Sequence, residues 1–234
     1  MRADMFVANA LNISRNKASQ MIKDGKILLD GEVLDKASSE ILGGEVLATD
    51  EIYVSRAALK LKGFLQNVGL EISGKTALDI GSSTGGFVQI LLENGAKSVV
   101  ALDVGSMQLD ENLRNDTRVK VLENTDIREF KNQSQFDIVT CDVSFISLNL
   151  ILSYIEPLFK EHMILLFKPQ FEVGKEAKRN KSGVVVDKKA IERAMAKFEL
   201  KCASLGLLIQ EKQESQIKGK EGNSEYFYLF KKAF

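Results

Sequence analysis

The sequence predicts an α/β protein in which a sheet wrapped by helices follows a small α+β unit. From residue 55 onward, apolar runs of strand length alternate with segments whose apolar residues recur at helical spacing. That alternation is typical of parallel strands joined by crossover helices. The first 47 residues instead hold two short helical patterns and a strand pair around Asp30-Gly31, a dipeptide that favours a tight hairpin turn.

The small unit, residues 1–47, is expected to contain two helices and a hairpin. Apolar residues from Met5 to Leu11 favour the first helix, and Ser14 is the expected N-cap of the second. Residues 48–54, ATDEIYV, differ in composition from both neighbours and are expected to form an interdomain linker.

The large unit, residues 55–234, is expected to form one seven-stranded sheet. Its strands are the runs TALDIG, SVVALDVG, VKVLENTD, FDIVTCDVSF, MILLFKP, GLLIQEKQES and EYFYLFKK. Its helices are expected at 55–68, 86–94, 107–114, 148–159 and 188–205. The last two strands follow one another without a helix, so the sheet is expected to end in an antiparallel pair.

Composition excludes several classes of protein. The chain has 32 Lys and Arg against 32 Asp and Glu, which argues against a globally basic nucleic-acid binder but not against a local patch. No apolar stretch approaches the roughly 20 residues that span a bilayer, and the N-terminus lacks the apolar core of a signal peptide. We therefore expect a cytoplasmic protein without a membrane partner. Cys141 and Cys202 have no spaced partners, so neither a metal site nor a disulfide framework is expected.

A glycine-rich loop follows the first expected strand of the large unit, in ALDIGSSTGGFVQIL at residues 77–91. Glycines at such a place let the backbone approach a ligand closely. Asp79, Gly81 and Gly85 match, with one substitution, the pattern D-x-G-x-G-x-G of enzymes that use S-adenosylmethionine. The acid favours the sulfonium and ammonium of that cofactor, whereas it would repel the pyrophosphate of a dinucleotide. The alternative is that the glycines form only a turn and the acids only cap helices.

Two more acids end the next two expected strands. Asp103 stands where a carboxylate can accept both ribose hydroxyls of a nucleoside, and Asp126 where an adenine amino group can bind. The expected cofactor-binding residues are Asp79, Gly81, Ser82, Ser83, Gly85, Gly86, Phe87, Asp103, Asp126 and Asp142.

Asp142 and Lys168 end the fourth and fifth expected strands, in CDVSFISL and LLFKPQFEVGK. Ligands of open parallel sheets bind outside the carboxyl ends of the strands, so both side chains are expected to face the crevice beside the glycine-rich loop. A lysine that ends a buried strand is costly unless it is paired or functional. The alternative is an amine that reaches solvent with Asp142 as its partner.

Five short stretches stand in the order found in one known family: YVSRAALKL, DIGSSTGGF, DVSFISL, KPQFEVGK and GNSEYF. On these motifs the chain resembles, over essentially its whole length, the TlyA (haemolysin A) group of 2′-O-ribose rRNA methyltransferases, which are related to the FtsJ methyltransferases. The resemblance implies a Rossmann-like S-adenosylmethionine-dependent methyltransferase sheet over residues 55–234. The opening, residues 1–47, is similar to the S4-like RNA-binding domain.

The resemblance places the family's catalytic Lys-Asp-Lys-Glu tetrad on Lys60, Asp142, Lys168 and Glu225. A ribose 2′-hydroxyl is a poor nucleophile and must lose its proton as it attacks a methyl carbon. In a cluster of two lysines and two carboxylates, one amine can be neutral enough to accept that proton. We assign Lys168 as base or orienting group, with Asp142 and Glu225 positioning it, and Lys60 to electrostatic support. Displacement at a sulfonium needs no metal.

Basic residues gather late in the chain, where residues 168–201 hold ten Lys and Arg against five Asp and Glu. Such a segment can contact phosphates, although a charge run can also be only a solvated surface. The expected RNA-binding residues are Arg2, Arg15, Lys17, Lys23, Arg56, Lys175, Lys178, Arg179 and Lys181. The resemblance implies ribosomal RNA within ribosomal subunits as partner. The lack of a segment before residue 2 favours the family's shorter subtype, which modifies a cytidine of the large-subunit 23S rRNA, with 16S rRNA as the alternative.

Three alternative functions are compared with the sequence. A ribosome assembly factor would bind rRNA without catalysis, and the complete tetrad and acid–glycine loop argue against it. A haemolysin that acts on membranes would need an amphipathic or apolar segment suited to insertion, and none is visible in the sequence. A nicotinamide-dependent oxidoreductase is disfavoured by Asp79.

Overall fold

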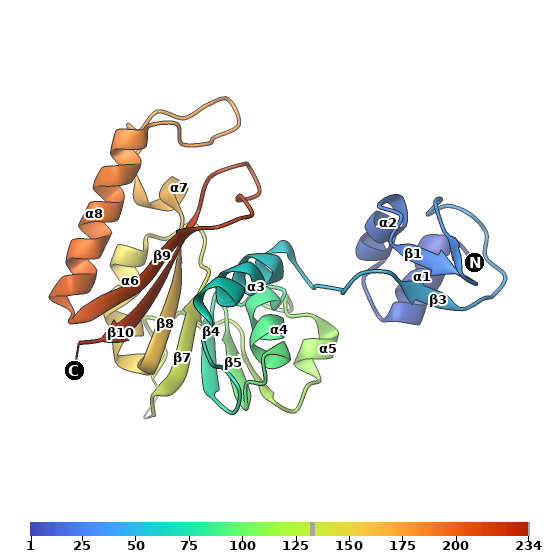
Figure 1. The fold of residues 1–234 in the computed structure, drawn as a ribbon, viewed down its shortest axis with the longest axis horizontal. Helices are drawn as coiled ribbons and strands as arrows, with labels where there is room; N and C mark the ends of the chain where they lie inside the picture. The colour runs from blue at the N-terminus through green and yellow to red at the C-terminus, as the bar shows by residue number, and fades with distance from the viewer. Residues whose placement is uncertain (132–133, 234) are drawn as a thin grey trace. The chain divides into compact units, whose positions relative to one another are not determined.

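The chain divides into two units, Met1–Ile52 and Tyr53–Phe234. The structure is a computed structural model that describes residues 1–131 and 134–233 (Figure 1). The division falls within residues 48–54, the stretch expected to act as a linker. Each unit has a hydrophobic core of its own.

The small unit contains two helices, α1 (Ala3–Leu11) and α2 (Arg15–Lys23), and a three-stranded antiparallel sheet in the order β2-β1-β3. Its strands are β1 (Ile27–Leu29), β2 (Glu32–Val33) and β3 (Val46–Ala48). The two expected helices and the hairpin are present. The Oγ atom of Ser14 accepts a hydrogen bond from the Lys17 amide, as an N-cap does. Asp30 and Gly31 turn the hairpin with φ of 51° and 85°.

Helix α1 buries Ala3 and Val7 fully, whereas Met5 of the same helix is 41% exposed. The strand β3 was not expected, and its last residue, Ala48, pairs with Ile27 where the linker was expected to begin. Three residues are too few to show an alternating pattern, so the sequence gives no signal for this strand.

The large unit contains a seven-stranded sheet in the order β6-β5-β4-β7-β8-β10-β9. Its first five strands run parallel, and β10 is antiparallel to both of its neighbours, as expected. The strands are β4 (Thr76–Ile80), β5 (Ser98–Leu102), β6 (Val119–Leu122), β7 (Phe136–Cys141), β8 (Phe159–Phe167), β9 (Leu207–Glu214) and β10 (Tyr226–Lys232).

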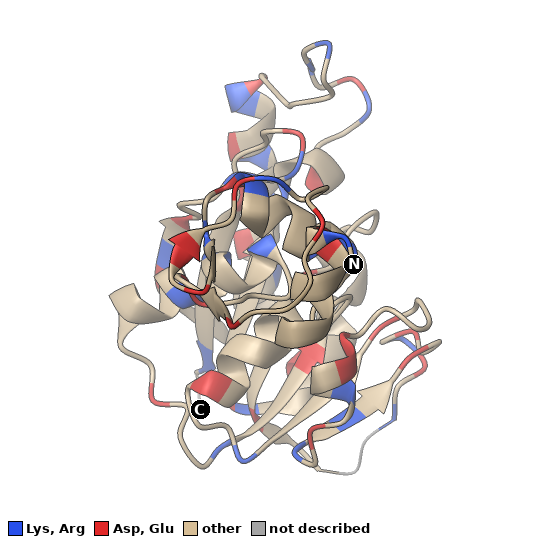
Figure 2. Ribbon diagram, turned by 90° about the vertical axis from the view of Figure 1, so that its right-hand side faces the viewer, with Lys and Arg blue, Asp and Glu red and all other residues tan. Residues whose placement is uncertain are grey.

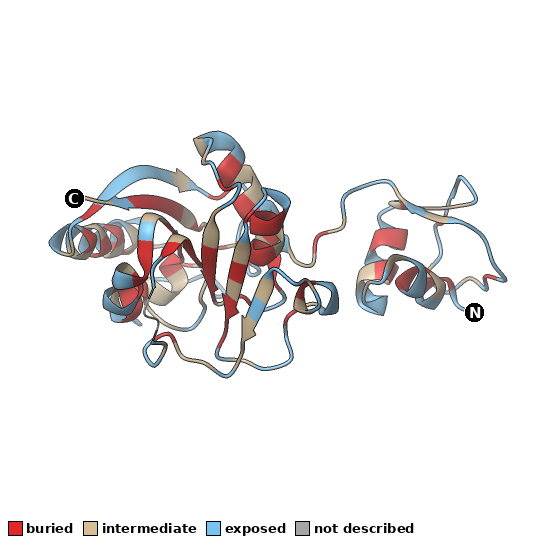
Figure 3. Ribbon diagram, turned by 90° about the horizontal axis from the view of Figure 1, so that it is seen from below, coloured by how far each residue is buried: buried red, intermediate tan, exposed pale blue. Residues whose placement is uncertain are grey.

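Helices cover both faces of this sheet (Figure 1). They are α3 (Arg56–Val68), α4 (Gly86–Glu93), α5 (Glu111–Arg114), α6 (Leu148–Ile155), α7 (Pro169–Glu172) and α8 (Lys188–Ser204). Because side chains alternate along a strand, Ala77 packs into a core with α3 and α4 while Leu78 packs into a second core with α6 and α8. Figure 3 shows buried positions along the strands and on the helices that pack against them.

Two helices are shorter than expected. The helix expected over 107–114 spans only Glu111–Arg114, and the one expected over 148–159 ends at Ile155. Pro157 lies in the 3-10 turn Glu156–Leu158 that follows, and its missing N–H prevents the α-helix from continuing. Strand β8 then begins at Phe159, four residues before the expected run MILLF.

None of the helices in the described residues is both long and apolar enough to cross a membrane.

Candidate active site

Two adjoining cavities open at the carboxyl ends of the parallel strands. The first, of about 660 Å³, is bounded by the loop after β4, the start of α3, the ends of β7 and β8, and the loop before β10. The second, of about 350 Å³, lies beside the ends of β5 and β6. They share five lining residues, which are Gly81, Ser83, Asp142, Ser144 and Phe145. A ligand in one cavity therefore lies beside a ligand in the other.

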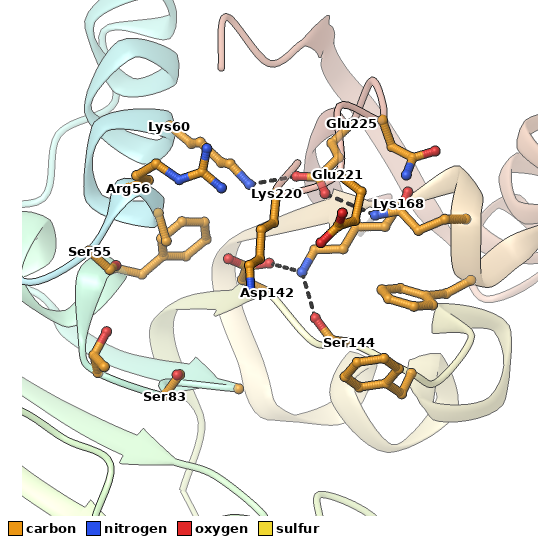
Figure 4. A pocket seen from close by; sticks show the side chains of 18 of the residues that line it. Ser55, Arg56, Lys60, Ser83, Asp142, Ser144, Lys168, Lys220, Glu221 and Glu225 are labelled. Atoms are coloured by element: carbon orange, nitrogen blue, oxygen red, sulfur yellow. Dashed lines mark hydrogen bonds and ion pairs between the residues drawn. The ribbon is translucent and has the colours of Figure 1, made fainter. Parts of the chain in front are cut away.

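Two buried ion pairs lie in the first cavity (Figure 4). Lys168 Nζ lies 2.6 Å from Asp142 Oδ1, and Lys60 Nζ lies 2.6 Å from Glu225 Oε2. Lys60 lies in α3, Asp142 and Lys168 directly follow β7 and β8, and Glu225 directly precedes β10. Each of the four side chains is at most 13% exposed. The structure thus brings the four expected tetrad residues together from positions far apart in the sequence.

Glu225 differs from expectation in its partner. It was expected to position Lys168, but its two carboxylate oxygens accept hydrogen bonds from Lys60 Nζ and, at 3.0 Å, from Gln170 Nε2. Asp142 alone of the two acids pairs with Lys168. The cluster is therefore two parallel pairs rather than one lysine held by two acids.

Burial raises the pKa of two acids at this site. Burial raises the pKa of Asp142, which the charge of Lys168 opposes. Burial also raises the pKa of Asp79 to about 7. Asp79 Oδ1 accepts a hydrogen bond of 2.7 Å from Thr140 Oγ1, while the buried Oδ2 has no partner among the described residues. A cationic group in the first cavity would supply the missing partner of this oxygen.

The second cavity holds the other two expected acids. Asp103 accepts hydrogen bonds from the Ser83 and Gly105 amides, at 2.8 and 2.7 Å, which leaves lone pairs of both oxygens for a ligand. Asp126 lines the same cavity, but its oxygens accept three hydrogen bonds from Arg128. These bonds leave one of the roughly four lone-pair positions of the carboxylate, on Oδ2, for an adenine amino group.

The structure requires glycine for different reasons at different positions of the loop after β4. Gly81 lines both cavities with a φ of 79°, and a Cβ there would lie 3.0 Å from the backbone oxygen of Asp142. Gly85 and Gly86 line neither cavity, contrary to expectation. A Cβ on Gly85 would lie 2.3 Å from Leu113 of α5, and one on Gly86 would lie 2.3 Å from Ser55 Oγ. These two glycines permit helix packing instead. Ser82, Ser83 and Phe87 line the first cavity.

Replacing Gly86 by alanine is therefore expected to destabilise the large unit. The new Cβ would lie 2.8 Å from the Ala58 amide nitrogen, which is backbone of α3 and cannot rotate away. Overpacking of this kind costs about 1–3 kcal/mol, measurable as a lower midpoint of urea unfolding. Gly43→Ala is the control, because a Cβ at Gly43 meets nothing within 4 Å. An unchanged midpoint for Gly86→Ala would contradict this packing.

The model of the FtsJ-like methyltransferase family matches residues 53–232, and that of the S4 domain matches residues 1–47. The chain belongs to the FtsJ-like methyltransferase family.

Three relatives are similar over nearly the whole chain. One, the 23S rRNA (cytidine-2′-O)-methyltransferase TlyA of Campylobacter jejuni, is 52% identical across 98% of this chain and 99% of its own. The 16S/23S rRNA (cytidine-2′-O)-methyltransferase TlyA of Mycobacterium tuberculosis is 36% identical across 95% and 86%. A solved structure of a candidate hemolysin from Streptococcus thermophilus covers 99% of this chain and 88% of its own, with 33% identity and a TM-score of 0.74.

The basic residues expected to bind RNA fall into two groups in this FtsJ-like unit. Arg56 and Arg179 line the first cavity, and a terminal nitrogen of Arg179 donates to the Gln170 carbonyl at 3.2 Å. Lys175, Lys178 and Lys181 lie on the loop before α8, where Figure 2 shows basic positions along the chain. Hydrogen bonds between 178 and 186 and between 180 and 184 give this loop the form of a short hairpin.

Two of the expected RNA-binding residues in the S4 unit are engaged within the protein. Arg2 and Arg15 both pair with the buried Asp4, each at 3.0 Å, and the Arg2 hydrogen bond helps to hold the pKa of Asp4 at about 2. Both guanidinium groups keep about half of their side-chain surface exposed. They are thus fixed in orientation by Asp4 rather than free. Lys23 is exposed and Lys17 half-buried.

Sequence reasoning missed several residues of the first cavity. Ser144, Gln170, Lys220 and Glu221 all line it. Ser144 and Gln170 stand inside the motifs DVSFISL and KPQFEVGK, so their neighbours signal them. Lys220 and Glu221 precede GNSEYF in a loop without a pattern of its own, and only the fold brings them to the site.

Proposed function

We propose that this protein transfers a methyl group from S-adenosylmethionine to the 2′-hydroxyl of a cytidine in ribosomal RNA. The observation that carries the proposal is the pair of buried Lys–carboxylate contacts in a cavity that also contains the unpartnered oxygen of Asp79. The names of the two TlyA relatives support the substrate. We favour 23S rRNA because the relative named for 23S rRNA alone is the more similar, at 52% against 36% identity.

The residues around the two cavities fit S-adenosylmethionine. When bound, this cofactor supplies an electrophilic methyl group on a sulfonium. Asp79 has a buried oxygen without a partner that would pair with the ammonium of the cofactor, and Asp103 has lone pairs for ribose hydroxyls. Gly81 lets the backbone approach the ligand, since it lines both cavities without a side chain. Ser82, Ser83 and Phe87 complete the wall of the first cavity.

Lys168 is the proposed general base. Its amine accepts the proton of the 2′-hydroxyl as the oxygen attacks the methyl carbon and the carbon–sulfur bond breaks. In a buried cluster of two lysines and two carboxylates, one amine can be neutral enough to accept that proton. Asp142 positions the base, because its Oδ1 lies 2.6 Å from the amine.

Lys60 has a different proposed role because Glu225 holds it at 2.6 Å. Its positive charge lies beside the cavity in a buried setting, where it stabilises the negative charge that develops on the ribose oxygen. Glu225 fixes the lysine and balances its charge when no substrate is present. Gln170, which donates to the other oxygen of Glu225, orients that carboxylate.

The basic residues are the proposed RNA contacts outside the chemistry. Arg56 and Arg179 line the catalytic cavity, and the lysines of the hairpin before α8 extend the positive surface. In the S4 unit, Asp4 holds Arg2 and Arg15 in a fixed pose with exposed donors for phosphates. Since ribosomal subunits are cytoplasmic, we expect the enzyme to act there.

The fragment 53–234 is expected to bind S-adenosylmethionine with native affinity but to methylate rRNA poorly. All proposed cofactor and tetrad residues lie within it, together with two hydrophobic cores, whereas the S4 unit supplies part of the RNA contact. Calorimetry measures the first quantity and transfer of labelled methyl groups to ribosomal subunits the second. Loss of cofactor binding would contradict the assignment of the site to this unit, and full methylation would contradict the role of the S4 unit.

The proposed function is tested by incubating the purified protein with labelled S-adenosylmethionine and each ribosomal subunit from cells that lack the gene. We expect label in 23S rRNA of the large subunit. A non-catalytic assembly factor would bind subunits and leave both rRNAs unlabelled. The variant Lys168→Ala is the control for contaminating methyltransferases.

A further inference from the structure

Ser144 lies where the two cavities meet. It follows Asp142 by two residues in the loop after β7 and is one of the five residues that line both cavities. In the proposed function, the methyl donor and the target hydroxyl approach each other at this junction.

Lys168 contacts Ser144 as well as Asp142 (Figure 4). The Nζ atom of Lys168 donates a hydrogen bond of 3.1 Å to Ser144 Oγ and lies 2.6 Å from Asp142 Oδ1. The lysine side chain is only 10% exposed, so bulk water does not compete freely for the amine. Asp142 Oδ1 makes an ion pair with the amine but no hydrogen bond, so Ser144 Oγ is the hydrogen-bond acceptor of the amine among the described residues.

The tetrahedral geometry of nitrogen gives the hydrogen bond to Ser144 a consequence. One of the four positions around Nζ is the bond to carbon, and a neutral amine has two hydrogens and one lone pair for the other three. When Ser144 Oγ accepts one hydrogen, the lone pair is directed away from Ser144. Without this acceptor, rotation about the Cε–Nζ bond would let the lone pair take any of the three directions.

We propose that Ser144 is a positioning residue that directs the lone pair of the Lys168 amine away from Ser144 itself and so keeps it available to the incoming ribose 2′-hydroxyl. This inference rests on the proposed function, since it requires Lys168 to act as the base. Ser144 needs no proton transfer of its own, because its oxygen only accepts.

A second set of hydrogen bonds joins the loop after β7, which carries Ser144, to the segment that begins at Lys168. Glu172, four residues after Lys168, accepts hydrogen bonds from Ser147 Oγ at 2.6 Å and the Leu148 amide at 2.7 Å. The loop that carries Asp142 and Ser144 is therefore tied to the Lys168 segment at both of its ends. That arrangement holds Ser144 Oγ at a constant position relative to the amine.

The test measures the single-turnover rate of methyl transfer at saturating cofactor and RNA. Ser144→Ala is expected to lower this rate about tenfold, the effect of one ordinary hydrogen bond, with unchanged affinities for S-adenosylmethionine and for rRNA. Ser144→Thr keeps a hydroxyl and is expected to stay within about threefold of the native rate. Ser106→Ala, at an exposed serine that lines neither cavity, is the control. A native rate for Ser144→Ala, or a Thr variant as slow as the Ala variant, would overturn the inference.

A double-mutant cycle separates positioning of Lys168 from a direct contact with a ligand. In a Lys168→Ala background, adding Ser144→Ala is expected to change the remaining rate less than twofold, because there is no amine left to orient. A further tenfold loss in that background would show that Ser144 acts independently of Lys168 and would overturn the inference. If Lys168→Ala itself methylates at the native rate, the proposed base is wrong. A large Lys168 effect with no Ser144 effect refutes only the present inference.

Discussion

Lys168→Ala is expected to lower methyl transfer by roughly 100-fold or more, which is the typical contribution of a positioned general base. Cofactor affinity is expected to stay nearly native, because the proposed cofactor contacts come from Asp79, Asp103 and the glycine loop. Lys168→Arg is expected to fail as well, since a guanidinium stays protonated and cannot accept the proton of the hydroxyl. The single-turnover rate and the dissociation constant of S-adenosylmethionine, measured for each variant, test both statements.

The arginine variant separates two roles of Lys168. A general base requires a lone pair, whereas electrostatic stabilisation requires only a positive charge, and arginine retains the charge alone. Methylation near the native rate by Lys168→Arg would mean that Lys168 supplies only charge. The proton would then have to leave by another group, and Asp142, 2.6 Å from the amine, is the nearest acid that the structure offers.

Asp79→Asn is expected to weaken S-adenosylmethionine binding by about ten- to a hundredfold, the effect of losing a buried charge-assisted hydrogen bond. Asparagine keeps an oxygen for Thr140 Oγ1 but loses the negative charge that pairs with the ammonium of the cofactor. Because the pKa of Asp79 is about 7 in the protein without cofactor, the carboxyl must ionise before it can pair. Native affinity is therefore expected to fall about tenfold from pH 8 to pH 6, and that of the variant to change far less.

The same substitution is expected to have the opposite effect on stability. A carboxyl whose pKa rises from 3.8 to about 7 on folding favours the folded state in its protonated form, and that advantage is lost as the pH rises. At pH 8 the buried carboxylate costs free energy, so Asp79→Asn is expected to raise the free energy of unfolding by up to about 4 kcal/mol. Urea unfolding at pH 8 and pH 5 measures this change in the free energy of unfolding.

The binding measurement has its own contradicting outcome. If Asp79→Asn binds the cofactor as tightly as the native protein, Asp79 does not pair with the ammonium of the cofactor.

The sheet and its ligand-binding edge are largely readable from the sequence. The central parallel strands are apolar runs, and the residues that follow them (Asp103, Asp142 and Lys168) meet at one edge because parallel strands share a direction. The three-residue strand β3 has no room for a periodic pattern and was not predicted, whereas the equally short β1 and β2 were predicted from the Asp30-Gly31 turn between them. The four-residue helix α5 was predicted with twice its length.

Which site residues pair with each other depends on side-chain geometry, and the spacing of residues in the sequence does not predict that geometry. Lys60 lies in α3, and Glu225 lies 165 positions later in the sequence, just before β10. Only the packing of these two segments against each other decides that the two side chains pair. Gly85 and Gly86 were misread for a related reason. A glycine near a ligand site has the same letter whether it faces the ligand or a neighbouring helix.

Identification of the methylated nucleoside tests the central claim most directly. Ribosomal RNA from large subunits treated with the native protein and S-adenosylmethionine is digested to nucleosides and analysed by mass spectrometry, beside RNA treated with Lys168→Ala. We predict new 2′-O-methylcytidine in the native reaction and almost none with the variant. A methyl group on a base rather than on a ribose oxygen, or equal yields from the native protein and the variant, would contradict the proposed chemistry.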